Sequence, residues 1–86
     1  MAVVIADGDV GATGTYVAGG ITEVICNGDF ENATVDISVQ SDGSESAPAY
    51  SFWGPGAISI QSAPGTSIIA TVVGAGPASI DVSANP

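Results

Sequence analysis

The stretch FENATVDISVQSDG, residues 30–43, decides the fold of this 86-residue chain. Within it, apolar and polar side chains alternate strictly. The apolar set is Val35, Ile37 and Val39, and the polar set is Thr34, Asp36, Ser38 and Gln40. A period of two predicts a β-strand with one buried face. The residues that follow, Ser41-Asp42-Gly43-Ser44, predict a turn, because Asp can bond nearby backbone and Gly accepts a positive φ.

Short β-branched runs separated by turn residues recur through the rest of the chain. These runs are residues 2–6, 13–18, 21–26, 49–53, 57–62, 67–73 and 78–82. No window has a helical period of 3.6, and glycine and proline recur too often for long helices. The pattern therefore predicts one all-β domain over residues 1–86, a small antiparallel β-sandwich or barrel of seven to eight short strands.

Two glycine-containing turns predict β-hairpins. Gly19-Gly20 lies between two strand-like runs, and Asn27-Gly28-Asp29 contains one of the strongest two-residue hairpin signals. Each predicts that the strands before and after it pair with each other. Within run 21–26 either face is a candidate for burial. One face is Ile21, Glu23 and Ile25, and the other is Thr22, Val24 and Cys26.

The charge composition limits the kinds of partner. The chain has nine acidic residues, no Lys, Arg or His, and a formal net charge of −9. No ion pair between side chains can therefore form within it. An anionic surface repels nucleic-acid phosphates and anionic lipids, so we expect no nucleic-acid and no membrane partner. The negative charge still allows basic protein surfaces, divalent cations and neutral polymers as partners.

The residues required for most catalytic chemistry are missing from the sequence. Without His or Lys there is no side-chain base suited to activating a nucleophile near neutral pH. Cys26, the sole cysteine, can form neither a zinc ligand set nor an intrachain disulfide. Asp7 and Asp9 are the one candidate pair for calcium, but further oxygen ligands and a distant Glu are missing. We therefore expect an acidic turn, no metal, no cofactor and no enzymatic activity.

The run 67–73 is apolar on both of its faces. Ile68, Ala70 and Val72 form one face, and Ile69, Thr71 and Val73 form the other. Such a strand is expected at the centre of a sheet or at a subunit contact. Nothing obvious in the chain covers the second face. We therefore expect Ile69, Thr71 and Val73 to form an interface, either in a homo-oligomer or with a larger assembly.

Three aromatic residues, Tyr50, Phe52 and Trp53, crowd into four positions. One hypothesis makes them a platform for a ligand, such as a host-surface glycan, or for a protein partner. The other places Tyr50 and Phe52 in the core, with Trp53 capping one end. The large apolar area that a small core needs favours the second hypothesis.

From Phe30 onward the order of features resembles a group of small bacteriophage virion structural proteins. The resemblance consists of a strand onset, a turn, an aromatic residue, a second turn and a loop leading into a final strand. The matching residues are Phe30, Ala33, Thr34, Val35; Ser41, Asp42, Gly43; Trp53; Pro64, Gly65, Thr66; and Gly76, Pro77, Ala78, Ser79, Ile80, Val82. They span about two-thirds of the chain.

The resemblance implies a non-enzymatic virion protein, a capsid decoration or cement subunit, or alternatively a neck, tail or fibre component. Its partners would be the major capsid or another virion protein and copies of itself. A trimer is the first expectation, because icosahedral shells present three-fold positions. The absence of basic residues departs from the group and requires a complementary shell surface. Residues 1–6 lack the features of a secretory signal, so we expect synthesis in a host cytoplasm and assembly into a virion.

The uncompensated charge generates a first prediction about stability. Raising sodium chloride from low concentration to 1 M shortens the Debye length to about 3 Å and screens the mutual repulsion of the carboxylates. The midpoint of thermal unfolding should therefore rise with salt, which calorimetry or circular dichroism measures. An unchanged or lower midpoint would show that self-repulsion contributes little to the free energy of unfolding.

Overall fold

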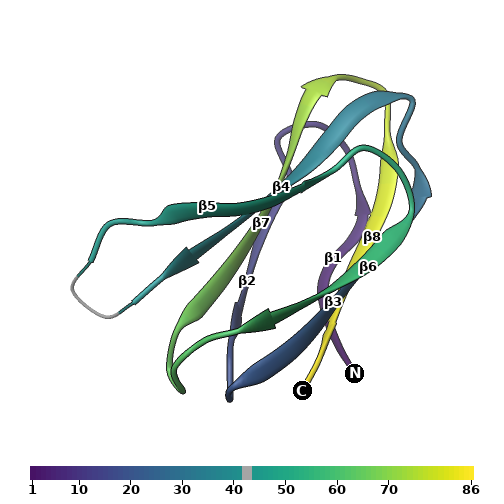
Figure 1. Cartoon of the computed structure of the whole chain (residues 1–86). Helices are drawn as coiled ribbons and strands as arrows, with labels where there is room; N and C mark the ends of the chain where they lie inside the picture. Colours follow the sequence, from purple (N-terminus) through teal and green to yellow (C-terminus); the bar gives the residue numbers. More distant parts are fainter. Residues whose placement is uncertain (42–43) are drawn as a thin grey trace.

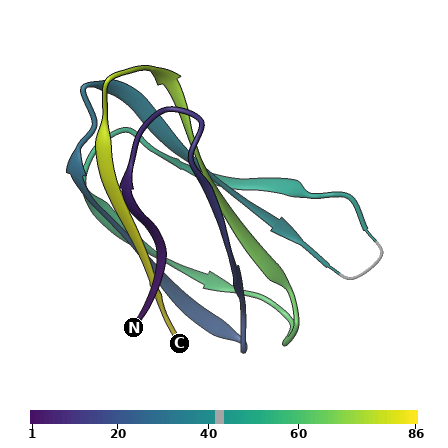
Figure 2. The same ribbon diagram turned by 180° about the vertical axis from the view of Figure 1, so that it is seen from behind.

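Two four-stranded antiparallel sheets pack against each other in a computed structural model that describes residues 1–41 and 44–86 (Figures 1 and 2). One sheet has the strand order β1-β8-β3-β6 and the other the order β2-β7-β4-β5. The strands are β1 (Ala2–Gly8), β2 (Thr13–Val17), β3 (Ile21–Asp29), β4 (Asn32–Gln40), β5 (Ala47–Phe52), β6 (Gly56–Gln61), β7 (Ser67–Ala75) and β8 (Ser79–Asn85). The prediction of a small all-β sandwich is confirmed.

Strand β4 buries the apolar face that its alternation predicts. Val35 and Ile37 are 0% and 1% exposed, and Val39 is half-buried against the same core. Ala33, at the start of the strand, is buried with them. Beyond the strand, the backbone N–H of Ser44 donates to the Ser41 carbonyl at 3.0 Å, and the predicted turn residues Asp42 and Gly43 lie outside the described part of the chain.

The remaining inner faces complete one hydrophobic core between the sheets. β7 lies between β2 and β4, so it is central, as the apolar character of both its faces predicts. β8 buries Ile80 and Val82. On β3, the side chains that point into the core are those of Thr22, Val24 and Cys26. Other buried members of the core are Ile5, Ala18, Phe30, Phe52, Ile68, Ala70, Val72 and Ala84.

Consecutive strands alternate between the two sheets. Among the strands that the structure describes, β4 and β5 are the only neighbours in sequence that also pair; every other connection passes from one sheet to the other. Each sheet is therefore built from strands that are distant in sequence, such as β1 with β8 and β2 with β7.

The predicted hairpin at Gly19-Gly20 is wrong. β2 pairs with β7, whereas β3 pairs with β6 and β8. Gly20 has a φ of 122°, a conformation that suits glycine, but the turn serves a crossing between sheets. The neighbouring loop holds it: Ser62 N–H donates to the Gly20 carbonyl at 2.9 Å, and Ala18 N–H donates to the Thr66 carbonyl at 2.8 Å.

The predicted hairpin at Asn27-Gly28-Asp29 is also wrong, because these residues continue β3. They pair with the first residues of β8, Gly28 lying opposite Ile80. The local signal was correct in one respect, since Gly28 has a φ of 108°. A Cβ at this position would collide with the Ser79 carbonyl, so close approach of β8 also requires glycine. The chain changes sheets after it, through Phe30 and Glu31.

The hairpin of β4 and β5 extends beyond one side of the sandwich (Figure 1). Every residue of β5 is exposed except Phe52. The strand pairs with β4 along one edge, and no other described strand pairs with its second edge. Its ladder with β4 is irregular between Ile37 and Ser38.

Within residues 1–41 and 44–86 the structure has no helix long and apolar enough to cross a membrane.

A buried hydroxyl in the core generates a second prediction. Thr22 is fully buried, and its Oγ1 has no hydrogen-bond partner among the described residues. A buried, unpaired polar group costs stability, so replacing the hydroxyl with a methyl of similar shape should remove that cost. Thr22→Val should raise the free energy of unfolding by roughly 1 kcal/mol, measured by denaturant unfolding.

Thr15→Val is the matched control, because Thr15 is exposed on the edge strand β2 and the chemical change is identical. The control should change stability by less than about 0.5 kcal/mol. A destabilised Thr22→Val variant beside a neutral control would show that the Thr22 hydroxyl makes a stabilising hydrogen bond.

Candidate partner-binding face

The outer surface of the β2-β7-β4-β5 sheet, called the outer face below, carries the residues predicted to form an interface. Ile69, Thr71 and Val73 of β7 lie on it and are half-buried, because strands flank β7 on both sides. The cross-strand register adds Thr13, Thr15 and Val17 from β2, Thr34, Asp36, Ser38 and Gln40 from β4, Ser67 from β7, and Pro48 and Ser51 from β5. The face is thus mixed, with two large apolar side chains at its centre.

A row of polar side chains crosses the outer face from one edge strand to the other. The register places Thr13 opposite Thr71, Thr71 opposite Asp36, and Asp36 opposite Ser51. The Ser51 hydroxyl donates to Asp36 Oδ1 at 2.9 Å, and the hydroxyls of Thr13 and Thr71 are 3.3 Å apart. Thr13 also donates to the Ala70 carbonyl at 3.1 Å. The described contacts of Asp36 thus involve a neutral donor and no positive charge.

A groove of about 620 Å³ lies on the outer face along β4, β5 and β7. Asp36, Ser51, Thr71 and Val73 line it together with Tyr50. Its volume lies within the range of roughly 300–1,000 Å³ that is typical of ligand sites. The groove therefore contains two predicted interface residues, Thr71 and Val73. The side chain of Tyr50 lies on the other face of β5, because its register partner is the core residue Ile37.

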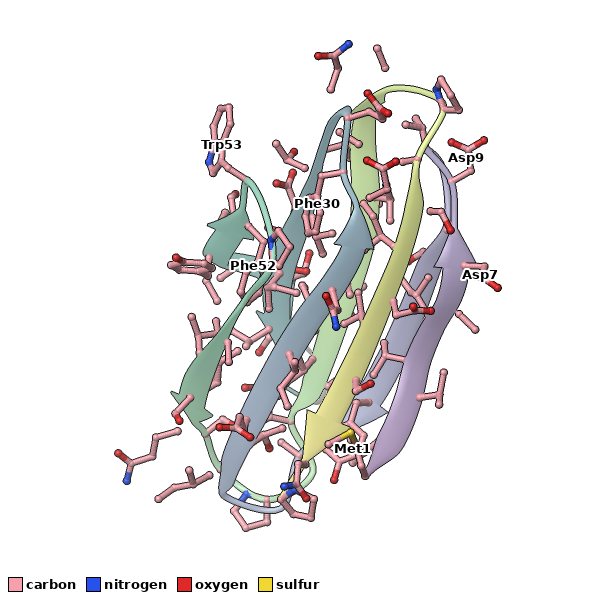
Figure 3. All side chains as sticks on the ribbon, turned by 90° about the vertical axis from the view of Figure 1, so that its right-hand side faces the viewer. Met1, Asp7, Asp9, Phe30, Phe52 and Trp53 are labelled. Carbon is pink, nitrogen blue, oxygen red and sulfur yellow. The ribbon has the colours of Figure 1, made fainter. Side chains whose placement is uncertain are left out.

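The structure separates the three aromatic side chains of the predicted platform. Phe52 is 4% exposed and belongs to the core. Tyr50 is 48% exposed and contacts Phe52 edge-to-face, with ring centroids 4.9 Å apart and an interplanar angle of 70°. Trp53 is 82% exposed and projects away from the sheets (Figure 3). Phe52 thus fills the core as the second hypothesis expects. That hypothesis is wrong for Tyr50, whose ring is half-exposed, and for Trp53, which is too exposed to cap the core.

Asp7 and Asp9, the candidate pair for calcium, form local hydrogen bonds near the ends of β1 and β8. Asp9 Oδ1 accepts from the backbone N–H of Val10 at 2.7 Å and of Ala78 at 2.9 Å. Asp7 Oδ1 accepts from the Ser79 hydroxyl at 3.3 Å. Among the residues that the structure describes, no group of three or more His, Cys, Asp or Glu side chains could hold a metal ion.

Cys26 lies in the core on β3 and is 1% exposed. Burial raises the pKa of its thiol to about 12, since the thiolate would lose its hydration. A neutral, inaccessible thiol is a poor nucleophile. Cys26 therefore acts as a small apolar side chain.

Two residues of the groove, Asp36 and Ser51, were not singled out by the sequence. Alternation places Asp36 on the polar face of its strand, but nothing in the sequence reveals which strand lies beside it. The pairing of Asp36 with Ser51 depends on the β4–β5 register, which includes an irregularity. A groove built across three strands therefore leaves no local pattern.

Comparison with known protein families, with curated proteins and with solved structures finds no match to this chain. Arguments about function therefore depend on its residues and its surfaces.

The buried thiol generates a third prediction, on pH dependence. An unfolded chain loses the thiol proton near pH 9, whereas the folded chain keeps it to about pH 12. The neutral thiol favours the folded state, so this contribution is complete below pH 9 and is lost as pH rises from 9 toward 12. The free energy of unfolding should fall across this window by up to about 1.4 kcal/mol per pH unit, measured by denaturant titration.

Cys26→Ala is the control, because it removes the titrating group while keeping a small apolar residue. The free energy of unfolding should fall less steeply with pH in the variant, and the difference between the two slopes gives the contribution of the thiol. Equal slopes above pH 9, or rapid reaction of the native thiol with a disulfide reagent, would contradict burial of a neutral Cys26.

Proposed function

We propose that the chain is a non-enzymatic structural subunit of a bacteriophage particle, a capsid decoration or cement protein that binds the shell through its outer face. The observation that supports this most is the outer face itself. Ile69 and Val73 lie at its centre, polar side chains surround them, and a groove runs beside them. An apolar centre with a polar rim is typical of protein–protein interfaces.

The resemblance of residues 30–82 to small phage virion proteins supports the particle as the location. The mechanism would be passive. Many copies bind where shell subunits meet, and each contact gains strength because several subunits are bridged at once. Such a role needs a stable sheet surface and no catalytic group, in accord with a chain that has no Lys, Arg or His.

A homo-oligomer, with a trimer first, stays part of the proposal. Its electrostatic cost is considerable, because each copy has a net charge of −9 and Asp36 lies on the outer face. Association through that face should therefore strengthen when salt screens the repulsion. Light scattering at low and high sodium chloride measures this self-association. A monomer under both conditions would show that the outer face does not bind a second copy of the chain.

A second candidate function, binding of a host-surface glycan, is favoured by one observation. The groove presents the oxygens of Asp36, Ser51 and Thr71, and the half-exposed ring of Tyr50 lies close by on the opposite face of β5. Trp53 is highly exposed but does not line the groove. A glycan array separates the proposals, because a cement protein should bind no glycan and should co-purify with capsids.

The outer face generates a fourth prediction. Val73→Asp places a charge in the proposed interface, where desolvation is unfavourable. Binding to purified particles should weaken by roughly tenfold or more, measured by co-sedimentation. The circular dichroism of β structure should be unchanged.

Val3→Asp is the matched control, because Val3 is 73% exposed on β1 in the other sheet and gains the same charge. Equal weakening by both variants would indicate general repulsion and would contradict docking through the outer face. A cryo-electron microscopy map of the decorated particle distinguishes head from neck, tail or fibre.

A further inference from the structure

We propose that the exposed edge of β6 accepts an extended basic segment of a shell protein, which adds to the β1-β8-β3-β6 sheet as a fifth strand. This contact lies on the other sheet from the outer face, so one copy would hold two shell components at once. The identity of the partner as a shell protein rests on the proposed function. The site itself rests on the backbone edge of β6, on the apolar side chains beside it and on the charge of the chain.

Of the four edge strands, β6 is the one that lacks protection against pairing. Natural sheets protect their edges with charged residues, proline, bulges or a covering segment. β1 has two irregularities in its pairing with β8, and β5 contains Pro48 and an irregularity in its pairing with β4. β1 lies against β2, where a Cβ at Gly14 would collide with the Val4 carbonyl. β6 pairs with β3 in an unbroken register from Gly56 to Gln61, contains neither proline nor a charged residue, and has no partner for its second edge among the described strands.

The edge of β6 belongs to a long neutral segment of an otherwise acidic chain. The acidic residues occur at or before Glu45 and at Asp81, so residues 46–80 carry no charged side chain. Backbone hydrogen bonds to an added strand supply the affinity in this mode of recognition. Those bonds would form here without the cost of desolvating a charged side chain of β6.

The inner sides of β5 and β6 present apolar side chains that the two sheets leave partly uncovered. Ile58 and Ile60 alternate on β6 and pack against the core while remaining half-buried. Tyr50 lies on the core-facing side of β5, opposite Ile37, and its ring is 48% exposed. β5 and β6 diverge from the turn that joins them and do not pair with each other (Figures 1 and 2). An added strand would place every second side chain beside Ile58 and Ile60 and remove more of their surface from water.

Charge favours a basic segment of another protein over a second copy as the occupant. A second copy has the same net charge of −9, whereas a basic segment is attracted at long range. Near the edge, Glu23 is exposed on the outer side of β3, opposite Ser59. A basic residue of the added strand beside Ser59 would lie two strand spacings, about 10 Å, from the backbone of Glu23. A lysine or arginine side chain and a glutamate side chain span that distance together.

The test uses the intact chain and the peptide Ser-Val-Lys-Val-Ser with blocked ends. Paired with β6, its valines would lie beside Ile58 and Ile60 and its lysine beside Ser59. In the free chain the outward-pointing amide hydrogens of β6 should exchange rapidly with solvent. At a peptide concentration about ten times the Kd their exchange should slow by about tenfold, because exchange then requires release of the peptide. Nuclear magnetic resonance measures this, and edge amides of β1, β2 and β5 should not change.

N-methylation of the peptide tests the backbone pairing directly. Amide hydrogens of alternate residues in an edge strand point in opposite directions, so only one alternate set faces β6. One peptide is methylated at both valines, and the other at the lysine and the last serine. One of the two should lose tenfold or more in affinity, and the other should bind within about threefold of the parent peptide.

Two variants test the residues, each with a matched control. Ser59→Lys places a like charge beside the peptide lysine and should weaken binding by roughly tenfold. Thr15→Lys adds the same charge on the edge strand β2 of the other sheet and should bind like wild type. Glu23→Gln should weaken binding by roughly threefold, whereas Glu31→Gln, in the connection between β3 and β4, should not. Unchanged amide spectra away from each substitution show that the variant is folded.

Several outcomes would overturn the proposal. Equal loss of affinity by the two N-methylated peptides would show that the backbone of β6 is not the binding group. Slower exchange at β6 on concentrating the chain alone would make a second copy the occupant. Slower exchange at β5 in place of β6 would move the site to the other sheet. Equal weakening by Glu23→Gln and Glu31→Gln would refute the contact with Glu23 and leave only general attraction.

The particle assay separates this proposal from the proposed function. A wild-type chain that binds the peptide at β6 but binds no particle would support the edge site and refute the cement role. Particles that bind Ser59→Lys as well as wild type, while the peptide does not, would keep the cement role and refute β6 as a docking site for the shell.

Discussion

The antiparallel pairing of β4 with β7 is the interaction on which the other features of the structure depend. The nine residues of β4 pair with the nine of β7, from Asn32 opposite Ala75 to Gln40 opposite Ser67, with no irregularity. Val35 and Val72 lie opposite each other on the inner side and are fully buried. On the outer side the same register places Asp36 opposite Thr71. One ladder therefore determines both the core and the groove.

The sequence predicts what is local in this fold and misses what is distant. The alternation in residues 34–40 correctly assigns the buried face of β4, and β-branched runs locate the other strands. Gly20 and Gly28 are correctly associated with positive φ. Their expected hairpins fail because a φ value says nothing about which strand pairs with which. In this chain the decisive pairs join residues such as Ile5 and Val82, almost the whole sequence apart.

The same limit applies to the candidate site. Thr71 and Val73 were predicted at an interface because a second apolar face needs cover, and they do line the groove. Asp36 and Ser51 were missed because their contact depends on the register across β4 and β5. Phe52 and Trp53 are adjacent in sequence and point to opposite environments, one to the core and one to solvent. Adjacency of aromatic residues therefore gave no indication of a shared function.

Charge also protects the exposed edge of the molecule. An unpaired strand such as β5 is a template for unwanted pairing between copies. The irregular pairing near Pro48 and the repulsion between copies of net charge −9 both oppose it. The same charge attracts a basic surface, so electrostatics alone disfavours pairing between copies more than pairing with a basic protein.

The alternation of strands between sheets has a consequence for the rate of folding. Apart from the β4–β5 hairpin, each described ladder joins strands that are separated by at least one other strand in sequence. The entropy of closing long loops must be overcome before these contacts gain free energy. Topologies of this kind fold in roughly milliseconds to seconds, more slowly than helical proteins of the same size. The β4–β5 hairpin is the exception and can form early, which gives the strand at the centre of the fold a partner before β7 has been synthesised.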